Sequence, residues 1–429
     1  MVLHLNNQQA DFESQFTKLL GAKREQAEDV ARDAAAIIAS VREKGDAALA
    51  ELTLRFDRHQ PQNLRFSEAE IKQAYEACEP EIRTALELAA SRIRAYHERQ
   101  KPNDERFTDA TGVEQGHRWT PVSAVGLYVP GGTAAYPSSV LMNAIPASVA
   151  GVARIVMVVP TPDGIVNAQV LAAAHIAGVS EIYRIGGAQA IAALAYGTKT
   201  IAPVAKITGP GNAYVAEAKR QVFGRVGIDM IAGPSEVLIL ADGENDPDWV
   251  ALDLLAQAEH DTAAQSILIT NDANFAEQVE KAIARQLTRL PRQAIASESW
   301  AQHGAIILVD DLTKACALID RLAPEHLQIL TANAEQLIAQ IHHAGAIFIG
   351  AFTPEAVGDY VGGPNHVLPT SRSARFSSGL NVLDFMKRTS ILKCSSQALA
   401  AIGPAAVTLA RAEGLEAHAR SVAVRLNMP

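Results

Sequence analysis

Cysteine is scarce in this chain of 429 residues, which contains only Cys78, Cys316 and Cys394. These residues lie far apart in the sequence and form no Cys-x-x-Cys pair. Such spacing supports neither a disulfide framework nor a zinc site made of thiolates. The pattern is typical of a protein of the reducing cytoplasm.

An excess of positive charge is also missing. The chain has 38 lysine and arginine residues against 47 aspartate and glutamate residues, which gives a net charge of −9. This balance does not favour nucleic acid or an anionic membrane as a partner, because both are themselves negative. A small molecule is therefore the expected ligand. The amino-terminal segment is too polar, and too poor in basic residues, to predict a secretory signal.

A continuous apolar run of membrane-spanning length is lacking as well. The uncharged stretch 119–153 is interrupted by glycine or proline at six positions between Gly126 and Pro146. This composition predicts a buried strand, a glycine-rich loop and a helix, with no membrane span.

The order of the remaining patterns predicts the organisation of the chain. Its length predicts two or three domains, since one domain commonly has about 100 to 200 residues. Residues 1–105 are expected to be mostly helical, with one helix over 29–44 that ends at Gly45 and another that opens with a capping box at Ser67–Glu70. From about Val122, short Val/Ile runs alternate with Ala-rich stretches, which is typical of βαβ units and a parallel sheet. The expected strands are 153–159, 181–185, 205–207, 236–240, 265–269, 305–309 and 346–349.

These strands predict two α/β units that face one another, with ligands beyond the carboxyl ends of the strands. The loops 128–132, 186–187 and 209–212 fall there and are candidate nucleotide contacts. No Gly-x-Gly-x-x-Gly motif follows a strand, so the residues alone do not establish dinucleotide binding. The tail from Ser396 onward is expected to be helical, with breaks at 403–404 and at Gly414.

Glu325 and His326 are adjacent, at the entrance of a predicted strand. Neighbouring residues of an extended segment point to opposite faces, so one can address a substrate hydroxyl and the other a water, provided that the backbone bends locally. A carboxylate and an imidazole placed in this way can divide two proton transfers. The pair predicts two chemical steps.

Gln257 and His260 are three residues apart in a predicted helix. This spacing puts both side chains on one face, where they can bind one metal ion. The same pattern also fits an ordinary solvated helix face.

Two further segments carry polar groups that suit a site. Asp359 and His366 lie in the Gly- and Pro-rich segment 358–370, which is either a loop that positions functional groups or an ordinary turn with Asp359 as its cap. Glu413 and His418 lie in the tail, where a plain surface helix is the alternative.

Taken together, these segments resemble the histidinol dehydrogenase family over nearly the whole chain. The motifs that carry the resemblance are Gly126–Gly132, Gly186–Ala190, Gly209–Asn212, Ala232–Glu236, Gln257–His260, Pro324–Leu327, Asn365–Thr370 and Ala374–Ser378. Each motif alone is short and unspecific. So many motifs in the same order as in the family are specific for it.

The resemblance implies a fold as well. It is an α/β fold of two Rossmann-like (aldehyde-dehydrogenase-like) parallel-sheet domains with small N- and C-terminal helical extensions. The expected division is an N-terminal arm at 1–25, a first α/β domain from 26–127 together with 237–380, a second, NAD-contacting α/β domain at 128–236, and a C-terminal helical tail at 381–429. In the family this tail docks on the partner subunit, which implies a homodimer.

The functional residues are likewise implied by the resemblance. One Zn²⁺ per subunit would be held by Gln257, His260, Asp359 and His418, the last from the partner. NAD would contact Tyr128, Gln189 and Asn212. L-histidinol would contact Ser235, Gln257, His260, His326, Asp359, His366, Glu413 and His418. Because glutamine is a rare zinc ligand, Gln257 is assigned through the resemblance and not through ligand preference.

The implied reaction is the four-electron oxidation of L-histidinol to L-histidine through histidinal, linked to NAD. His326 would be the general base of the hydride steps, and Glu325 would activate water. Two alternatives stay open: a zinc hydrolase that uses water activated by Glu325, and a dehydrogenase of the same fold for another amino or sulfonated alcohol.

Overall fold

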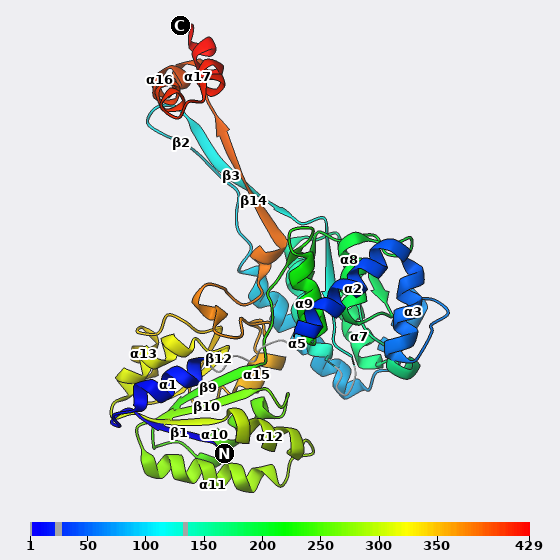
Figure 1. Cartoon of the computed structure of the whole chain (residues 1–429), viewed down its shortest axis with the longest axis vertical. Helices are drawn as coiled ribbons and strands as arrows, with labels where there is room; N and C mark the ends of the chain where they lie inside the picture. The colour runs from blue at the N-terminus through cyan, green and yellow to red at the C-terminus, as the bar shows by residue number, and fades with distance from the viewer. Residues whose placement is uncertain (1, 22–27, 132–135) are drawn as a thin grey trace.

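The computed structural model describes residues 2–21, 28–131 and 136–429, and these form two α/β lobes and a long projecting arm (Figure 1). Each lobe is built on a parallel sheet, which confirms the predicted fold class. The expected strands that begin near residues 153, 181, 205, 236, 265, 305 and 346 are all present.

The first lobe contains a six-stranded parallel sheet. Its strands, in spatial order, are β1 (Leu3–Asn6), β11 (Ala305–Leu308), β10 (Gln265–Thr270), β9 (Glu236–Ala241), β12 (His326–Leu330) and β13 (Ala346–Ile349). Its helices are α1 (Phe12–Gly21), α10 (Pro247–Ala258), α11 (Ala273–Leu287), α12 (Gln293–His303), α13 (Leu312–Leu322), α14 (Ala334–Ile338) and α15 (Glu355–Tyr360). Apolar side chains from α1 and α13 cover one face and those from α10 to α12 cover the other, so both faces are buried.

The second lobe contains a five-stranded parallel sheet. Its strands, in spatial order, are β6 (Glu181–Tyr183), β5 (Arg154–Val158), β4 (Ala124–Tyr128), β7 (Lys206–Thr208) and β8 (Gly227–Ile228). One face packs on α2 (Glu28–Lys44), α3 (Asp46–Asp57), α8 (Gly187–Tyr196) and α9 (Ala213–Val222). The other face packs on α4 (Glu68–Ala77), α5 (Pro80–Glu98), α6 (Pro137–Ala150) and α7 (Ala168–Ala177).

This packing differs from the expected division, which grouped residues 26–127 with 237–380. The helices α2 to α5 cover the five-stranded sheet, and β4 is the central strand of that sheet. The expected arm at 1–25 supplies β1, an edge strand of the other lobe. In the sequence, the apolar faces of these helices could pack on either sheet. Only contacts between distant segments of the folded chain determine which sheet they cover. The expected boundary at 25–26 lies outside the described residues.

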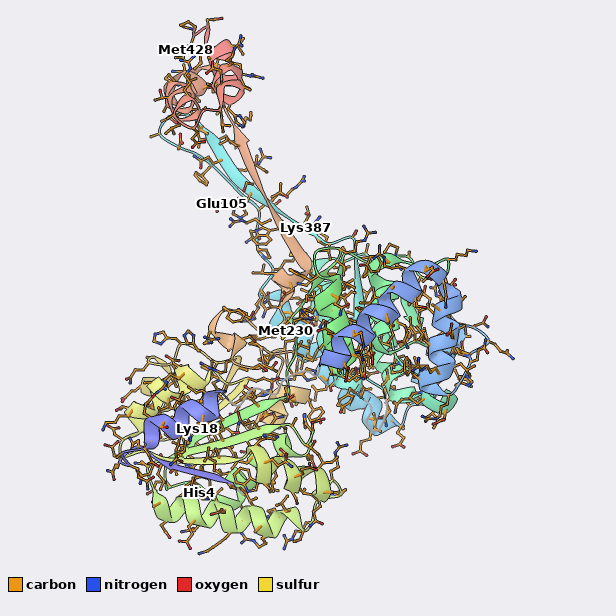
Figure 2. All side chains as sticks on the ribbon, in the orientation of Figure 1. His4, Lys18, Glu105, Met230, Lys387 and Met428 are labelled. Atoms are coloured by element: carbon orange, nitrogen blue, oxygen red, sulfur yellow. The ribbon has the colours of Figure 1, made fainter. Side chains whose placement is uncertain are left out.

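The arm is an antiparallel sheet of β2 (Glu105–Thr108), β3 (Glu114–Pro121) and β14 (Met386–Lys393), and Figure 2 labels Glu105 and Lys387 on it. At its far end lie α16 (Ser396–Ala412) and α17 (Glu416–Ala423). Short 3₁₀ turns cover Pro162–Gly164, Ser373–Arg375, Val382–Phe385 and Val424–Leu426. The expected helical tail at 381–429 therefore begins with a 3₁₀ turn and the strand β14, which pairs with β3.

The expected break at 403–404 is also wrong, because α16 continues through Gly403 and Pro404. A Cβ on Gly403 would lie 2.6 Å from Leu426, so the glycine serves close packing against the end of the chain. The predicted break at Gly414 is confirmed, since its φ of 74° ends the helix before α17.

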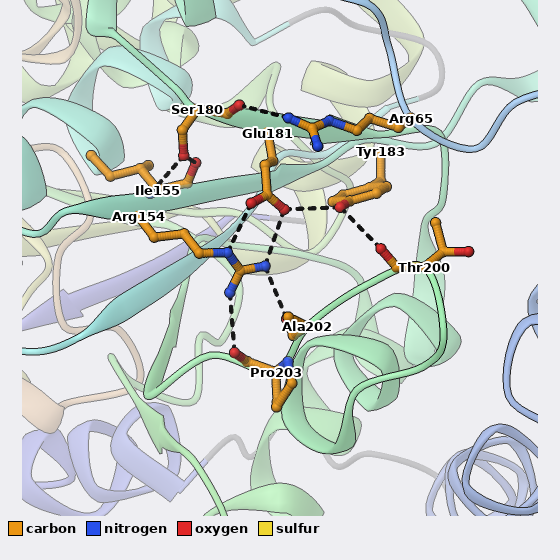
Figure 3. Close-up of polar contacts among 9 residues, drawn as sticks. All are labelled: Arg65, Arg154, Ile155, Ser180, Glu181, Tyr183, Thr200, Ala202 and Pro203. Carbon is orange, nitrogen blue, oxygen red and sulfur yellow. Dashed lines mark hydrogen bonds and ion pairs between the residues drawn. The ribbon is translucent and has the colours of Figure 1, made fainter.

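An ionic cluster lies at the amino ends of β5 and β6, opposite the ligand-facing edge of the sheet (Figure 3). Arg154 makes two hydrogen bonds to Glu181, of 2.9 and 3.0 Å, and also donates to the carbonyl oxygens of Ala202 and Pro203. The Tyr183 hydroxyl donates to the same Glu181 carboxylate at 2.8 Å. The cluster joins β5 and β6 to each other and to the loop at 202–203, so it stabilises this end of the sheet.

The stretch 119–153 contains the expected buried strand and helix, β4 and α6, and residues 132–135 of the expected loop between them lie outside the described part. Among the described helices, none combines the length and apolar composition needed to cross a membrane.

Candidate active site

His326 is the first residue of β12, and Glu325 precedes it in the short connection from α13. The backbone of Glu236, at the start of β9, holds both: its N–H donates to Glu325 Oε2 at 2.9 Å, and its carbonyl oxygen lies 3.0 Å from His326 Nδ1. Both side chains are buried, with about 5% exposed. Because a carbonyl oxygen can only accept, Nδ1 of His326 carries the ring proton in this hydrogen bond. The other ring nitrogen, Nε2, faces the site.

The adjacent carboxylates give the pair unusual proton affinities. Burial raises the pKa of the Glu325 carboxyl to about 7, although His326 opposes this shift. Burial also opposes the charged form of His326, but the carboxylates around it, Glu355 first, raise the pKa of the ring well above its ordinary value. The site therefore holds a carboxyl that titrates near neutrality beside a ring whose protonated form is stabilised by the surrounding carboxylates.

The helix α15 presents two carboxylates to His326. Glu355 and Asp359 are one turn apart, and each places an oxygen 3.6 Å from a ring nitrogen of His326, Glu355 at Nδ1 and Asp359 at Nε2. Burial raises the pKa of Glu355 to about 8. Burial also acts on Asp359, but the neighbouring His326 outweighs it and the pKa of Asp359 falls below its ordinary value.

Glu355 is a residue that the sequence did not single out. Its place in the first turn of α15, after Pro354, is typical of an acidic residue near a helix amino end, so no signal marked it. Segment 358–370, expected to be loop throughout, begins on this helix. The three groups His326, Glu355 and Asp359 have ligand atoms within 4.8 Å of one another, a spacing compatible with a metal ion.

Gln257 and His260 approach from α10. The helix ends at Ala258, so His260 lies in the following turn and not on the predicted helix face. Arg292 holds this turn by donating to the carbonyl oxygens of Glu259 and His260. The pKa of His260 is lowered because surrounding protein desolvates the ring, an effect that nearby Asp359 opposes.

The side-chain amide of Gln257 is buried without a partner in the described part of the chain. Its side chain is fully buried, and neither Oε1 nor Nε2 has a hydrogen-bond partner within the described part of the chain. A buried amide without partners is costly, so a ligand that satisfies its oxygen fits this position. The buried, unpartnered amide of Gln257 is compatible with its predicted role as a metal ligand together with His260 and Asp359.

His366 and Ser235 border this group from two other segments. His366 Nδ1 lies 2.9 Å from the carbonyl oxygen of Asp359, and its Nε2 lies 3.3 Å from the hydroxyl of Ser139 on α6. Ser235 is half-buried, directly before β9. Because α6 belongs to the five-stranded lobe, the site lies where the two lobes meet.

Glu413 and His418 are not brought to this place within one chain. Both are exposed, Glu413 after α16 and His418 on α17, at the end of the arm. The expectation assigned them to the site of a partner subunit, and the arm projects away from its own lobes, as such an exchange requires.

The residues expected to contact NAD gather at the carboxyl ends of β4, β6 and β7. Tyr128 is buried, and its hydroxyl accepts a hydrogen bond of 3.0 Å from the Gly187 N–H. Gln189 is buried on α8, and its Oε1 has no partner among the described residues. Asn212 caps α9 by accepting from the Val215 N–H at 3.1 Å.

A cavity of about 480 Å³ opens at the carboxyl ends of β4 and β5. Its walls combine apolar and charged side chains, among them Phe56, Arg58, Phe66, Pro130, Pro160 and Asp163. A cavity of this size at the carboxyl ends of parallel strands suits a small organic ligand.

The molecule has two lobes, each built on a parallel sheet. One lobe has loops at its strand ends and the other has buried acid–base groups, an arrangement that defines a two-lobed α/β enzyme with dehydrogenase-like architecture. The family model described as histidinol dehydrogenase matches residues 21–426. The chain belongs to the histidinol dehydrogenase family and is an oxidoreductase.

Known histidinol dehydrogenases align with this chain over nearly its full length. A histidinol dehydrogenase from Rhodospirillum rubrum is 64% identical over 430 residues, covering 100% of this chain and 99% of the relative. One from Ruegeria pomeroyi is 65% identical, with 99% and 98% covered. The crystal structure of histidinol dehydrogenase from Elizabethkingia anophelis is 38% identical with a TM-score of 0.95, covering 99% of this chain and 98% of that one.

Proposed function

We propose that the protein catalyses the zinc-dependent, NAD-linked oxidation of L-histidinol to L-histidine through histidinal, a transfer of four electrons. The observation that carries this proposal is the buried pair Glu325 and His326, both held by the backbone of one residue, Glu236. Two adjacent groups with different proton affinities suit two consecutive oxidations better than one hydrolysis.

In the first oxidation, His326 Nε2 takes the proton of the substrate hydroxyl. Asp359 and Glu355 stabilise the resulting imidazolium, since their oxygens lie 3.6 Å from the ring nitrogens. In the second, Glu325 removes a proton from the water that adds to the aldehyde, and His326 returns its proton to the aldehyde oxygen. His326 then accepts a hydroxyl proton of the resulting gem-diol as the second hydride leaves. NAD, when bound, supplies the hydride acceptor for each oxidation.

Gln257, His260 and Asp359 of one subunit, with His418 of a second copy, would hold the zinc ion. The unpartnered amide of Gln257 supports its place in this set. A bound zinc ion would orient the imidazole and amine nitrogens of histidinol. Ser235, His366 and Glu413 would complete the contacts to the substrate.

NAD would lie across the strand ends, against Tyr128, Gln189 and Asn212. The amino end of α9, capped by Asn212, suits the pyrophosphate, because a helix amino end favours anions. The apolar walls of the adjacent cavity, including Phe56 and Pro160, suit the adenine ring.

The protein would act as a cytoplasmic homodimer. The helices of the arm share a small apolar core of Val407, Ala419 and Ala423, and the end of the arm exposes Leu409 and Val424 by 64% and 68%. A helix pair with this small a core gains stability by docking on another surface. A second copy in which the arms are exchanged would bring Glu413 and His418 to the opposite site.

Product stoichiometry tests this function. Purified protein with L-histidinol and excess NAD is expected to yield two NADH per histidine. Removal of the metal with a chelator should stop the reaction, and added Zn²⁺ should restore it. Hydrolysis of an amide or ester substrate without any NADH absorbance would instead favour a zinc hydrolase, and turnover of other amino alcohols at equal rates would favour a related dehydrogenase.

A further inference from the structure

A buried ion pair lies beneath the loop Gly209–Asn212, away from the acid–base groups. Lys219 on α9 and Asp229 after β8 form this pair, and only 2% and 1% of their side chains are exposed. Charges so deeply buried are costly unless paired, and such a pair is weak evidence for stability alone. Its other contacts therefore indicate what it does.

Both charges also bind Gly209. The Gly209 N–H donates to Asp229 Oδ2 at 2.8 Å, and the Gly209 carbonyl oxygen accepts from Lys219 Nζ at 3.1 Å. The anion thus holds the amide on one side of the glycine, and the cation holds the carbonyl on the other. These charge-assisted bonds fix the rotation of the peptide groups on both sides of one residue.

The conformation of Gly209 needs such support. Its φ is 110°, a region that residues with side chains rarely adopt, and an added Cβ would lie 2.1 Å from the Tyr128 carbonyl oxygen. The glycine therefore brings its loop directly against the end of β4. Tyr128 and Asn212, both proposed NAD contacts, stand on the two sides of this close approach.

Asp229 also connects this loop with the other lobe. It begins the segment 229–235, which runs from β8 to β9 and ends beside Glu236. Its neighbour Met230 lies where the two lobes meet (Figure 2). The same short segment thus touches the Gly209 loop at one end and leads at the other to Glu236, whose backbone holds Glu325 and His326.

We infer that Lys219 and Asp229 are positioning residues for the dinucleotide: their ion pair clamps both peptide groups of Gly209 and so sets the loop Gly209–Asn212 for NAD. This inference rests on the proposed function, because it takes that loop as an NAD contact. Neither residue touches the reacting atoms, and their effect is on the affinity for the dinucleotide.

The test replaces both charges together in the full-length zinc-loaded protein. The double variant Lys219→Met/Asp229→Leu removes both bonds to Gly209 and leaves no unpaired charge, a change that buried ion pairs often tolerate. We expect the KM for NAD to rise at least about tenfold, whereas the KM for histidinol changes little and kcat at saturating NAD falls by a smaller factor.

A matched control removes a different pair from the same sheet. Arg154→Met/Glu181→Leu eliminates the ionic cluster at the amino ends of the strands, far from the loops (Figure 3). It should lower the melting temperature and leave the KM for NAD unchanged. A stable Lys219/Asp229 double variant with the parental KM for NAD would overturn the inference.

A second measurement covers the case in which the double variant does not fold. Amide hydrogen exchange in the unaltered protein should show Gly209 among the protected amides, because its N–H is held by a buried carboxylate. Rapid exchange at Gly209 would also overturn the inference. NADH formation by the unaltered protein reports separately on the proposed function, so the two failures can be told apart.

Discussion

The two lobes hold their functional groups by different means. The six-stranded lobe brings charged side chains into a buried cluster, in which Glu325, His326, Glu355 and Asp359 shift one another's pKa. At the strand ends of the five-stranded lobe lie glycine backbone and the neutral side chains of Tyr128, Gln189 and Asn212, and the charges sit beneath them.

The difference matches the tasks proposed for each lobe. Proton transfer needs groups whose charge can change, and burial among carboxylates tunes that change. Binding a long dinucleotide needs close approach of backbone, which glycine allows. Changes in the first lobe should therefore alter chemical steps, and changes in the second should alter the affinity for NAD.

The replacement His326→Asn should have the largest effect. Asparagine cannot accept the hydroxyl proton, so both oxidations are expected to slow by about 100- to 10,000-fold, the usual contribution of a general base. Separate assays with histidinol and with histidinal measure this effect. A change in the KM for NAD alone, with both rates intact, would contradict the separation between the lobes.

The replacement Glu325→Gln should affect only one step. The amide cannot take a proton from water, so oxidation of histidinal should fall by about 100-fold or more, while oxidation of histidinol continues. Single-turnover assays with each substrate measure the two steps. Equal loss of both would reject the proposed division between Glu325 and His326.

The arm provides a test of whether one site is shared by two chains. The variants His418→Ala and His326→Asn should each be nearly inactive. If they are unfolded together and reassembled, random dimers should recover about a quarter of the parental activity, because half of the dimers then contain one intact site. No recovery, with dimers confirmed by light scattering, would place all of the groups of a site on one chain.

The pH dependence should differ between the two oxidations. The pKa of Glu325 is raised to about 7, so below this pH its carboxyl keeps a proton and cannot take one from water. Oxidation of histidinal should therefore rise with pH through about 7, by about tenfold per unit on the acid side. In Glu325→Gln, the residual rate should lack this rise.

The smallest effect on catalysis is expected for Arg154→Met. The change breaks the cluster with Glu181 and should lower the free energy of unfolding by about 1 to 3 kcal/mol, since it leaves a half-buried carboxylate without its partner. Denaturant unfolding measures the loss. Both oxidation rates should stay at the parental level at 25 °C, and a loss of either would extend the site to the opposite edge of the sheet.

The sequence alone predicted the strands well and their lobes less well. Short apolar runs such as 236–240 are typical of strands buried in a parallel sheet, and they form strands as expected. The helices α2 to α5 have apolar faces that do not specify a sheet, so their assignment to the other lobe followed only from the structure.

The site shows the same limit. Glu325 and His326 are unusual as neighbours and were visible in the sequence, and the structure places Asp359 and His366 beside them. Glu355 looks like any acidic residue at the start of a helix, and only the packing of α15 turns it toward His326. Chemical character is local, whereas burial and proximity depend on the whole fold.

The pairing of β1 with β11 has a consequence for how the chain is made. Leu3 is matched with Ala305, so about three hundred residues must leave the ribosome before the first strand finds its neighbour. During synthesis this segment has to wait unpaired, while the five-stranded lobe, whose strands lie between residues 124 and 228, can already close.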